Sequence, residues 1–313
     1  MSTILPILPT LPASPSHHRE KCTPPISKHS LIASLREDFN LQTDSLLFSK
    51  IPPELRNDIF RLILASYDDE LAPYDAHKPY NFPGYRFRRR TDTALLSTCR
   101  RIYLEAHDLP VSLNEHVFWA NHHGPPGVKY HNKPIAQFSR LTVEQREAIE
   151  NVHIFATSYW LEKYLPGICK SSVFRMKHLK ITIRQVDWQG WEYNHPLTMI
   201  SNGWTACLKL ITNLESFEME LEIVERDKLQ LEALMKMMQP WRIQLANDRV
   251  LTTEGNNVAH RRYTGPSNYG GGVFYDFQMN KWSWRGGITH QDAASAPPLY
   301  YVGYTLLWKA KTV

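Results

Sequence analysis

The stretch Phe217-Glu-Met-Glu-Leu-Glu-Ile223 places apolar residues at every odd position and glutamates at 218, 220 and 222. Successive side chains of a β-strand point to opposite faces, so this alternation predicts a strand with one apolar and one acidic face. Leu179-Lys-Ile-Thr-Ile183 and Trp241-Arg-Ile-Gln-Leu245 alternate in the same way, and Asn151-Val-His-Ile-Phe-Ala156 is rich in β-branched and aromatic residues. We expect each of these segments to form a strand.

Helices are expected between these strands, at about 158–165, 197–211 and 227–239. A capping box formed by Thr142 and Gln145 predicts another short helix ahead of the first strand. Strands separated by helices favour parallel pairing through right-handed crossovers. The sequence therefore indicates an α+β fold with a central mixed α/β layer, which we favour over a leucine-rich-repeat array because the repeat consensus is absent.

The charges on these strands make their register testable. If the strands at 179, 217 and 241 are neighbours, Lys180, Arg184 and Arg242 flank the three glutamates. Opposite charges on adjacent strands contribute about 0.2–1 kcal/mol per pair, so we expect Glu220→Lys to destabilise the fold. A metal site is not expected there, because the glutamates spread over roughly 13 Å of strand.

Three short aromatic strands are predicted near the carboxy terminus, at 268–277, 281–287 and 299–308, with Gly and Pro clusters between them. The glycines at 270–272 lack the Gly-Lys-Ser/Thr continuation of a phosphate-binding loop. The aromatic side chains of these strands form either the cap of a sheet's core, which is the favoured interpretation, or the wall of a ligand site. They are Trp282, Trp284, Tyr300, Tyr304 and Trp308.

Two helices are predicted in the first half of the chain. In the segment 49–65, Pro52 and Pro53 suit a first helical turn, and apolar residues recur at 55, 59, 62 and 63. The segment 93–106 has a second apolar stripe, and Pro110 follows its end.

These two helices carry a resemblance to a known family. Ile51-Pro-x-Glu-Leu-x-x-x-Ile-Phe60, followed by Leu95-Leu-x-x-Cys-Arg-Arg101, resembles the F-box, and more specifically the F-box-like modules of uncharacterised fungal proteins. The resemblance covers roughly residues 44–120. One departure is the insertion 66–91, since an ordinary F-box joins these helices by a short loop.

The resemblance implies a substrate adaptor of a cullin–RING ubiquitin ligase, which positions a target protein and performs no chemistry of its own. It also implies that a Skp-type adaptor docks on Pro52, Leu55, Ile59 and Leu62. The alternative is that these four residues are simply core.

The insertion ends in a basic and aromatic cluster that contains Arg86, Arg88, Arg89 and Arg90. Between 81 and 105, six arginines outnumber two acidic residues, a local charge of +4. Interleaved arginines and aromatic rings can bind single-stranded nucleic acid. The cluster is short and no lysines continue it, so we favour a solvated, mobile loop and do not expect nucleic acid as a partner.

The composition sets broader limits. The 313 residues carry a net charge of +5 and are 42% hydrophobic and 21% charged, as in globular proteins. No apolar run approaches the ~20 residues of a membrane-spanning helix, and the 4 cysteines show no disulfide rhythm, which favours an intracellular protein, cytoplasmic or nuclear. We expect a disordered Pro-rich tail at 1–30, the F-box-like helical module at 31–120 and an α/β recognition region at 121–313.

Catalytic motifs are absent from the sequence. It contains no Gly-x-Ser-x-Gly elbow, no His-Glu-x-x-His helix and no dinucleotide fingerprint, and its histidines and cysteines lack zinc-ligand spacing. We therefore expect a protein–protein interaction protein without enzyme activity, cofactor or metal, whose partners are a Skp-type adaptor and an unknown protein target. Two alternatives stay open: a scaffold whose F-box-like helices are structural core only, and an enzyme with an unrecognised site.

Overall fold

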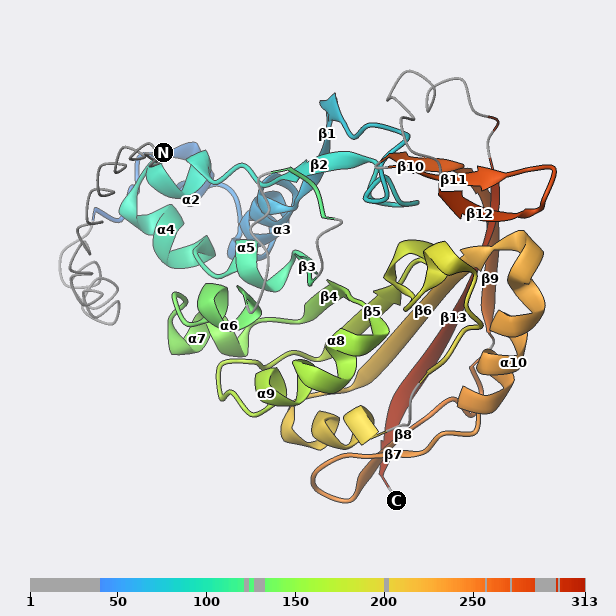
Figure 1. Cartoon of the computed structure of the whole chain (residues 1–313). Coiled ribbons are helices and arrows are strands. Elements are labelled where there is room, and N and C mark those ends of the chain that lie inside the picture. The colour runs from blue at the N-terminus through green and yellow to red at the C-terminus, as the bar shows by residue number, and fades with distance from the viewer. Residues whose placement is uncertain are drawn as a thin grey trace, which may run out of the picture.

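The computed structural model describes residues 40–120, 124–126, 133–199, 203–256, 258–270, 272–284, 297 and 299–312. The chain has an α+β fold, as predicted, with one large mixed sheet and two small antiparallel sheets (Figure 1). The Pro-rich segment 1–30 lies outside the described residues. Among the helices that the structure describes, none combines the length and apolarity needed to cross a membrane.

The large sheet has the strand order β3-β4-β5-β6-β13-β8-β7, and β9 also pairs with β13. Its strands are β3 His116–Trp119, β4 Asn151–Phe155, β5 His178–Ile183, β6 Ser216–Val224, β7 Ile243–Gln244, β8 Arg249–Thr252, β9 Ala259–Gly265 and β13 Leu299–Thr312. The four strands β3 to β6 are parallel, which confirms the expected crossover pairing. The remaining strands pair antiparallel.

Two strand predictions were wrong. The segment 241–245 contributes only the two-residue edge strand β7, and the second neighbour of β6 is β13, which pairs with it from Tyr301 to Lys309. The strand predicted at 299–308 is not short, since β13 runs for 14 residues through the middle of the sheet. No Gly or Pro cluster follows residue 308, so nothing in the local sequence ends the strand there.

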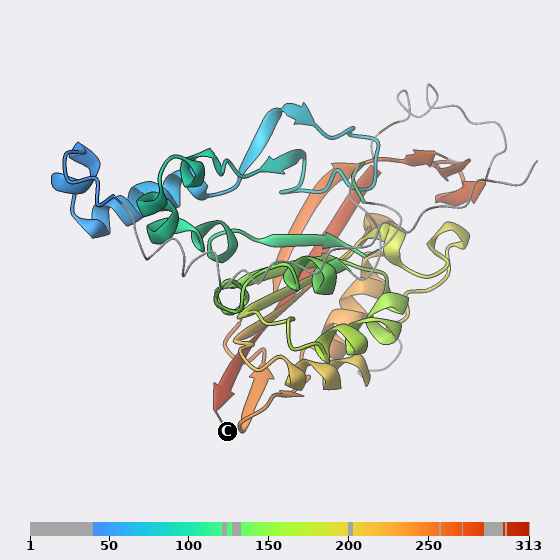
Figure 2. The same cartoon turned by 90° about the vertical axis from the view of Figure 1, so that its left-hand side faces the viewer.

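Helices cover the apolar face of the large sheet. They are α8 Ser158–Lys163, α9 Leu165–Cys169, the 3₁₀ helix η4 Gly203–Leu210 and α10 Lys228–Met238. Their buried side chains form one core with the apolar positions of β4, β5, β6 and β13, and in Figure 2 they lie on one side of the strands. Ahead of β4 lie α6 Lys133–Phe138 and α7 Val143–Glu147, and α7 begins with the predicted capping box.

The first half of the chain forms a helical module with a core of its own. It contains α2 Leu46–Ser49, α3 Pro53–Leu64, the 3₁₀ helix η1 Ala94–Ser97, α4 Arg100–Ala106 and α5 Leu109–Ser112. Its buried core is Phe60, Leu64, Ile102, Ala106 and Leu109. The helix predicted at 93–106 is broken, because Cys99 has an extended backbone and its Sγ caps α4 by accepting from Ile102 N–H at 3.5 Å.

The insertion 66–91 is an ordered ribbon and not the predicted mobile loop. Strands β1 Tyr67–Pro73 and β2 Phe87–Arg90 pair antiparallel, and the tip between them packs on the large sheet, where Phe82 is buried. The acids of β1 lie opposite the arginines of β2, in the pairs Asp68↔Arg89 and Asp69↔Arg88. Over 66–91 five basic residues meet four acidic ones, a net charge of +1, so the arginines of the ribbon are largely balanced by acids of the same ribbon.

The structure places the start of the large sheet ahead of the expected domain boundary at residue 120. Strand β3 lies within the segment assigned to the helical module, yet its only partner among the described strands is β4. The helical module and the sheet are therefore joined both by the chain at 113–115 and by the ribbon.

The aromatic carboxy-terminal segment forms a small antiparallel sheet of β10 Asn268–Gly270, β11 Val273–Asp276 and β12 Lys281–Trp284. The single strand predicted at 268–277 is thus split by a turn at Gly272, whose φ is +91°. Trp282 and Trp308 are buried in the main core, whereas Trp284 and Tyr300 are exposed, so these rings do not line one common wall.

Candidate functional site

The face of the large sheet that the helices leave uncovered is polar. Lys180 lies opposite Glu218 in the β5–β6 register, and its Nζ is 2.7 Å from Glu218 and 3.2 Å from Glu220. This part of the predicted charge ladder is confirmed. Arg184 pairs with Asp187 at 2.7 Å and also acts electrostatically on Glu222 of the ladder, whereas Arg242 was placed wrongly and pairs with Glu254 at 3.3 Å.

The acidic face that the alternation predicts is largely buried in the folded protein. The ribbon packs on it, and Arg261, which extends from the neighbouring strand β9, forms an ion pair with Glu220 while its guanidinium lies 4.3 Å from the ring centroid of Phe82. The Glu220 side chain is 3% exposed. A carboxylate this deeply buried requires opposite charges and hydrogen-bond donors around it.

A chain of hydrogen bonds crosses the polar face to the ribbon. Nε2 of His153 lies 2.7 Å from Oγ1 of Thr182, and that hydroxyl donates to Glu220 at 3.1 Å. Nδ1 of His153 lies 2.5 Å from the hydroxyl of Tyr85, which donates to Glu115 at 2.6 Å. Residues from the ribbon, from the segment before β3 and from three strands thus meet in one polar network.

His153 is neutral in this network. Its complete burial lowers the pKa of the ring well below the usual range, and the nearby cations, Lys180 first among them, lower it further. Its two ring nitrogens contact the hydroxyl groups of two other residues, Nε2 that of Thr182 and Nδ1 that of Tyr85. The imidazole is therefore a structural link between strands and has no free nitrogen for acid–base chemistry.

Glu222 is buried a short distance along the same face. It accepts from Gln185 N–H at 3.1 Å and from the hydroxyl of Tyr263. Burial raises the pKa of Glu222 to about 7, although the hydrogen bond from Gln185 and the charges of Arg184 and Arg261 oppose the shift. Glu222 is thus mainly protonated in the folded protein below about pH 7.

The titration of Glu222 predicts a pH dependence of stability. A folded-state pKa above that of the unfolded chain means that this stabilising contribution is complete below pH of about 4.5 and is lost as the pH rises through about 7. Glu222→Gln keeps the shape of the side chain but cannot titrate. Between pH of about 5 and 8 we expect wild type to lose on the order of 1–3 kcal/mol relative to the variant. Parallel curves of unfolding free energy against pH for the two proteins, measured in urea, would contradict this.

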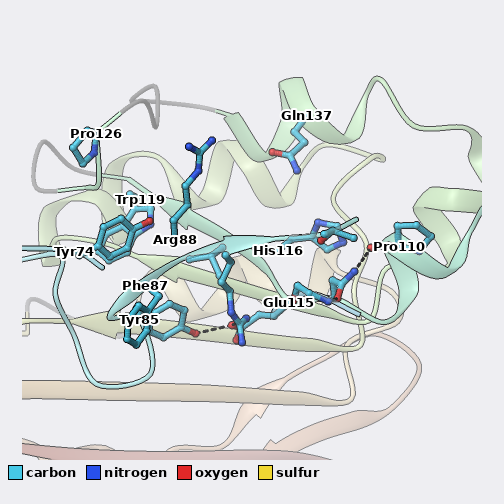
Figure 3. Close-up of a pocket in the computed structure, with 15 residues that line it drawn as sticks. Tyr74, Tyr85, Phe87, Arg88, Pro110, Glu115, His116, Trp119, Pro126 and Gln137 are labelled. Carbon is cyan, nitrogen blue, oxygen red and sulfur yellow. Dashed lines mark hydrogen bonds and ion pairs between the residues drawn. The ribbon is translucent and has the colours of Figure 1, made fainter. Parts of the chain in front are cut away.

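A cavity of about 490 Å³ opens between the ribbon and β3 (Figure 3). In Figure 3 the side chain of Arg88 rises between Trp119 on one side and Gln137 on the other, with Tyr74 beside Trp119. The lining is mixed aromatic and charged, and it includes Tyr74, Tyr85, Phe87, Arg88, Arg89, Glu115, His116, Val117, Trp119 and Gln137.

Of the four arginines singled out in the sequence, the structure brings Arg88 and Arg89 to this cavity. Arg89 is shared between Asp68 at 3.7 Å and Glu115 at 3.4 Å, whereas Arg90 pairs with Asp69 at 3.2 Å on the ribbon. Arg86 is exposed and does not line the cavity. Glu115, His116 and Trp119 belong to no sequence motif, so only the fold reveals them as cavity residues.

The residues carried over from the F-box resemblance lie on the surface of α3 and the turn before it. Pro52 is exposed, and Leu55, Ile59 and Leu62 have exposed fractions of 54%, 36% and 80%. They are therefore not core residues, contrary to the alternative interpretation.

The buried face of α3 is formed by Arg56, Phe60 and Leu64. Arg56 is accommodated there because its Nε and Nη2 each donate to a Glu105 carboxylate oxygen at 2.9 Å. Together with Ile63, the residues Leu55, Ile59 and Leu62 form an exposed apolar stripe along the helix.

The part of the chain that the structure describes contains no cluster of metal ligands and no activated thiol. Among the described residues, no three His, Cys, Asp or Glu side chains converge in a way that could hold a metal ion. Cys169 and Cys207 lie with their sulfurs 3.3 Å apart in the core, and the hydrogen bond between the two thiols together with burial raises the pKa of the Cys169 thiol. Raised thiol pKa values oppose nucleophilic reactivity.

Comparison with known proteins gives no family assignment. No protein-family model matches the chain, and neither a curated protein nor a solved structure is significantly similar to it.

Proposed function

We propose that this protein is a non-enzymatic adaptor that works inside the cell, in the cytoplasm or nucleus. Its helical module docks a Skp-type adaptor of a cullin–RING ubiquitin ligase through the apolar stripe, and its α/β region holds a target protein. The observation that carries the proposal is the exposure of Leu55, Ile59 and Leu62, the residues that the F-box resemblance assigns to docking.

The stripe has the composition of a contact surface. Large apolar side chains recur on one side of α3, and Leu46 of α2 is a further exposed apolar side chain of the same module. Contiguous exposed apolar patches with a polar rim mark interaction sites more often than singly exposed apolar residues do. Charged residues of α3, among them Glu54, Asp58 and Arg61, are exposed around the stripe and supply such a rim.

The architecture also suits an adaptor. The helical module has its own hydrophobic core, distinct from that of the sheet, so a partner docked on α3 leaves the α/β region accessible. The ribbon ties the two parts together, because the Arg184 guanidinium donates to the carbonyl of Pro79 at 2.6 Å and Phe82 is buried against Phe155. Such a rigid connection would hold a bound target in a fixed position relative to the ligase.

The test is co-purification with a purified Skp-type adaptor. We expect wild type to retain the adaptor and the Leu55→Asp/Ile59→Asp double variant to bind it at least about 100-fold more weakly, since two charges would be placed in an apolar contact. Leu71→Asp is the matched control, because Leu71 is 96% exposed but lies on β1, away from the stripe. It should bind like wild type.

Thermal melts by circular dichroism must first show that the double variant is folded. We expect it to fold, because the side chains of Leu55 and Ile59 are exposed. Equal retention of the adaptor by wild type and the folded double variant would refute docking through the stripe. A folded wild-type protein that retains no adaptor would refute the ligase proposal altogether.

A further inference from the structure

The cavity beside Arg88 is bounded by a free strand edge. Strand β3 is the terminal strand of the large sheet, and β4 occupies only one of its sides. The N–H of Ala120 donates to the carbonyl of Phe155 at 2.8 Å, and Trp119 lies opposite Phe155 in the register. Alternate residues of a parallel strand bond to the same neighbour, so the backbone groups of Val117 and Trp119 point away from β4.

The ribbon presents a second free edge to the same cavity. The N–H of Tyr74 donates to the carbonyl of Arg86 at 2.8 Å, which directs the backbone of Arg86 toward β1. The alternation then directs the backbone groups of Phe87 and Arg89 to the opposite edge of β2. Phe87, Arg89, Val117 and Trp119 all line the cavity, and no described strand pairs with either edge. Unpaired strand edges are templates for the addition of another strand.

The charge in the cavity indicates what kind of strand fits. Arg89 is neutralised by Asp68 and Glu115, but no carboxylate among the described residues forms an ion pair with Arg88. Arg88 thus contributes an unpaired cation, and the aromatic side chains of Tyr74 and Trp119 line the same cavity (Figure 3). A carboxylate would pair with Arg88, and an apolar side chain of the same ligand would pack against the rings. The volume of about 490 Å³ lies within the usual range of ligand sites, roughly 300–1,000 Å³.

We propose that this cleft binds an extended, acidic segment of a partner protein, which adds a strand to the free edge of β3 and pairs a carboxylate with Arg88. Main-chain hydrogen bonds to Val117 and Trp119 provide affinity, and Arg88 selects for acidic side chains. The site is separate from the apolar stripe on α3. It does not depend on whether the helical module docks a Skp-type adaptor.

The test begins with a display library of short random peptides selected on the immobilised full chain, with counter-selection on an Arg88→Glu/Val117→Pro double variant. We expect the enriched peptides to be acidic. The best of them, made as a fluorescent synthetic peptide, should bind wild type in an anisotropy titration, and Arg88→Glu should weaken it by at least about tenfold. Arg86→Glu is the matched control, because Arg86 carries the same charge on the same ribbon but does not line the cavity. It should change the affinity by less than about threefold.

Val117→Pro tests the strand addition itself. Proline removes the N–H that points to the free edge but no bond of the β3–β4 ladder, so the fold should persist while peptide binding falls by at least about tenfold. Binding that survives Val117→Pro and is lost with Arg88→Glu would show simple anion binding and overturn strand addition. Enrichment without an acidic preference, or no enrichment over the double variant, would overturn the proposal. Because Leu55→Asp/Ile59→Asp should bind the peptide like wild type, failure of adaptor docking and failure of this site are distinguishable.

Discussion

Glu220→Lys is expected to lower the free energy of unfolding by about 3–5 kcal/mol, the usual loss when one partner of a buried ion pair is removed. The Glu220 carboxylate contacts Lys180, Arg261 and the Thr182 hydroxyl on the covered polar face of the sheet. A lysine at this position would bring a third cation beside the other two and leave them without their shared counter-charge. Urea denaturation followed by circular dichroism measures the loss.

Two control variants distinguish the effect of burial at Glu220 from the effect that reversing any surface charge has on stability. Glu220→Gln keeps the shape of the side chain and an acceptor oxygen, so it should lower the free energy of unfolding by less, about 1–3 kcal/mol. Glu254→Lys reverses the charge of an exposed carboxylate that pairs with Arg242 and Lys311, and it should cost no more than about 1 kcal/mol. Equal losses for Glu220→Lys and Glu254→Lys would contradict the covered polar face that the structure describes.

Trp308→Ala is expected to cost about 3–5 kcal/mol, as large aromatic truncations in a core do. Trp308 is fully buried on β13, stacks on Phe217 with ring centroids 5.3 Å apart, and donates from Nε1 to the carbonyl of Trp241 at 3.2 Å. Removing the indole would leave a cavity between β6 and β13 and one carbonyl without its donor. The change should appear as a lower urea midpoint with an unchanged slope.

Trp284→Ala is the matched control, because this tryptophan lies on β12 and is 56% exposed. The free energy of unfolding of this variant should stay within about 1 kcal/mol of the wild-type value. If the two tryptophan variants unfolded at the same urea concentration, β13 would not be the central strand that the structure shows.

Sequence reasoning succeeded where the signal is local. The alternation in 179–183 and 217–223 identified β5 and β6, because a two-residue period follows directly from strand geometry. The capping box at Thr142 and Gln145 identified the start of α7, because both of its hydrogen bonds join residues three positions apart. The α+β fold class and the parallel pairing followed from the order of these elements.

The predictions from sequence failed where strand pairing or burial depends on segments that are far apart in the chain. Nothing within 299–312 indicates that this strand inserts between β6 and β8, since antiparallel pairing over such a separation depends on the whole sheet. The same holds for the burial of Glu220, which depends on the ribbon and on Arg261 of β9, both distant from β6 in the sequence. The ribbon itself was hidden because the acids at 68–70 neutralise arginines about twenty residues away.

The same distinction applies to the candidate functional sites: the sequence indicated some of their residues, and the fold was needed to identify the others. The apolar residues of α3 were identified from the sequence, but apolar residues occur on both sides of this helix, and its inner face contains the charged Arg56. In the structure Phe60 and Leu64 pack against α4 and α5 on the face where Arg56 pairs with Glu105, and Leu55 and Ile59 are exposed. The cleft beside Arg88 required the structure, because two strand edges from different sheets form it.

Hydrogen–deuterium exchange of the full chain, with and without a saturating Skp-type adaptor, tests the docking proposal most directly. We expect exchange to slow in α3, over residues 53–64, because a partner on the apolar stripe stabilises this helix against local opening. Strands β2 and β3, on the separate cleft, should exchange as in the free protein. Slowed exchange at β2 and β3 in place of α3, or no change anywhere at saturation, would contradict docking through α3.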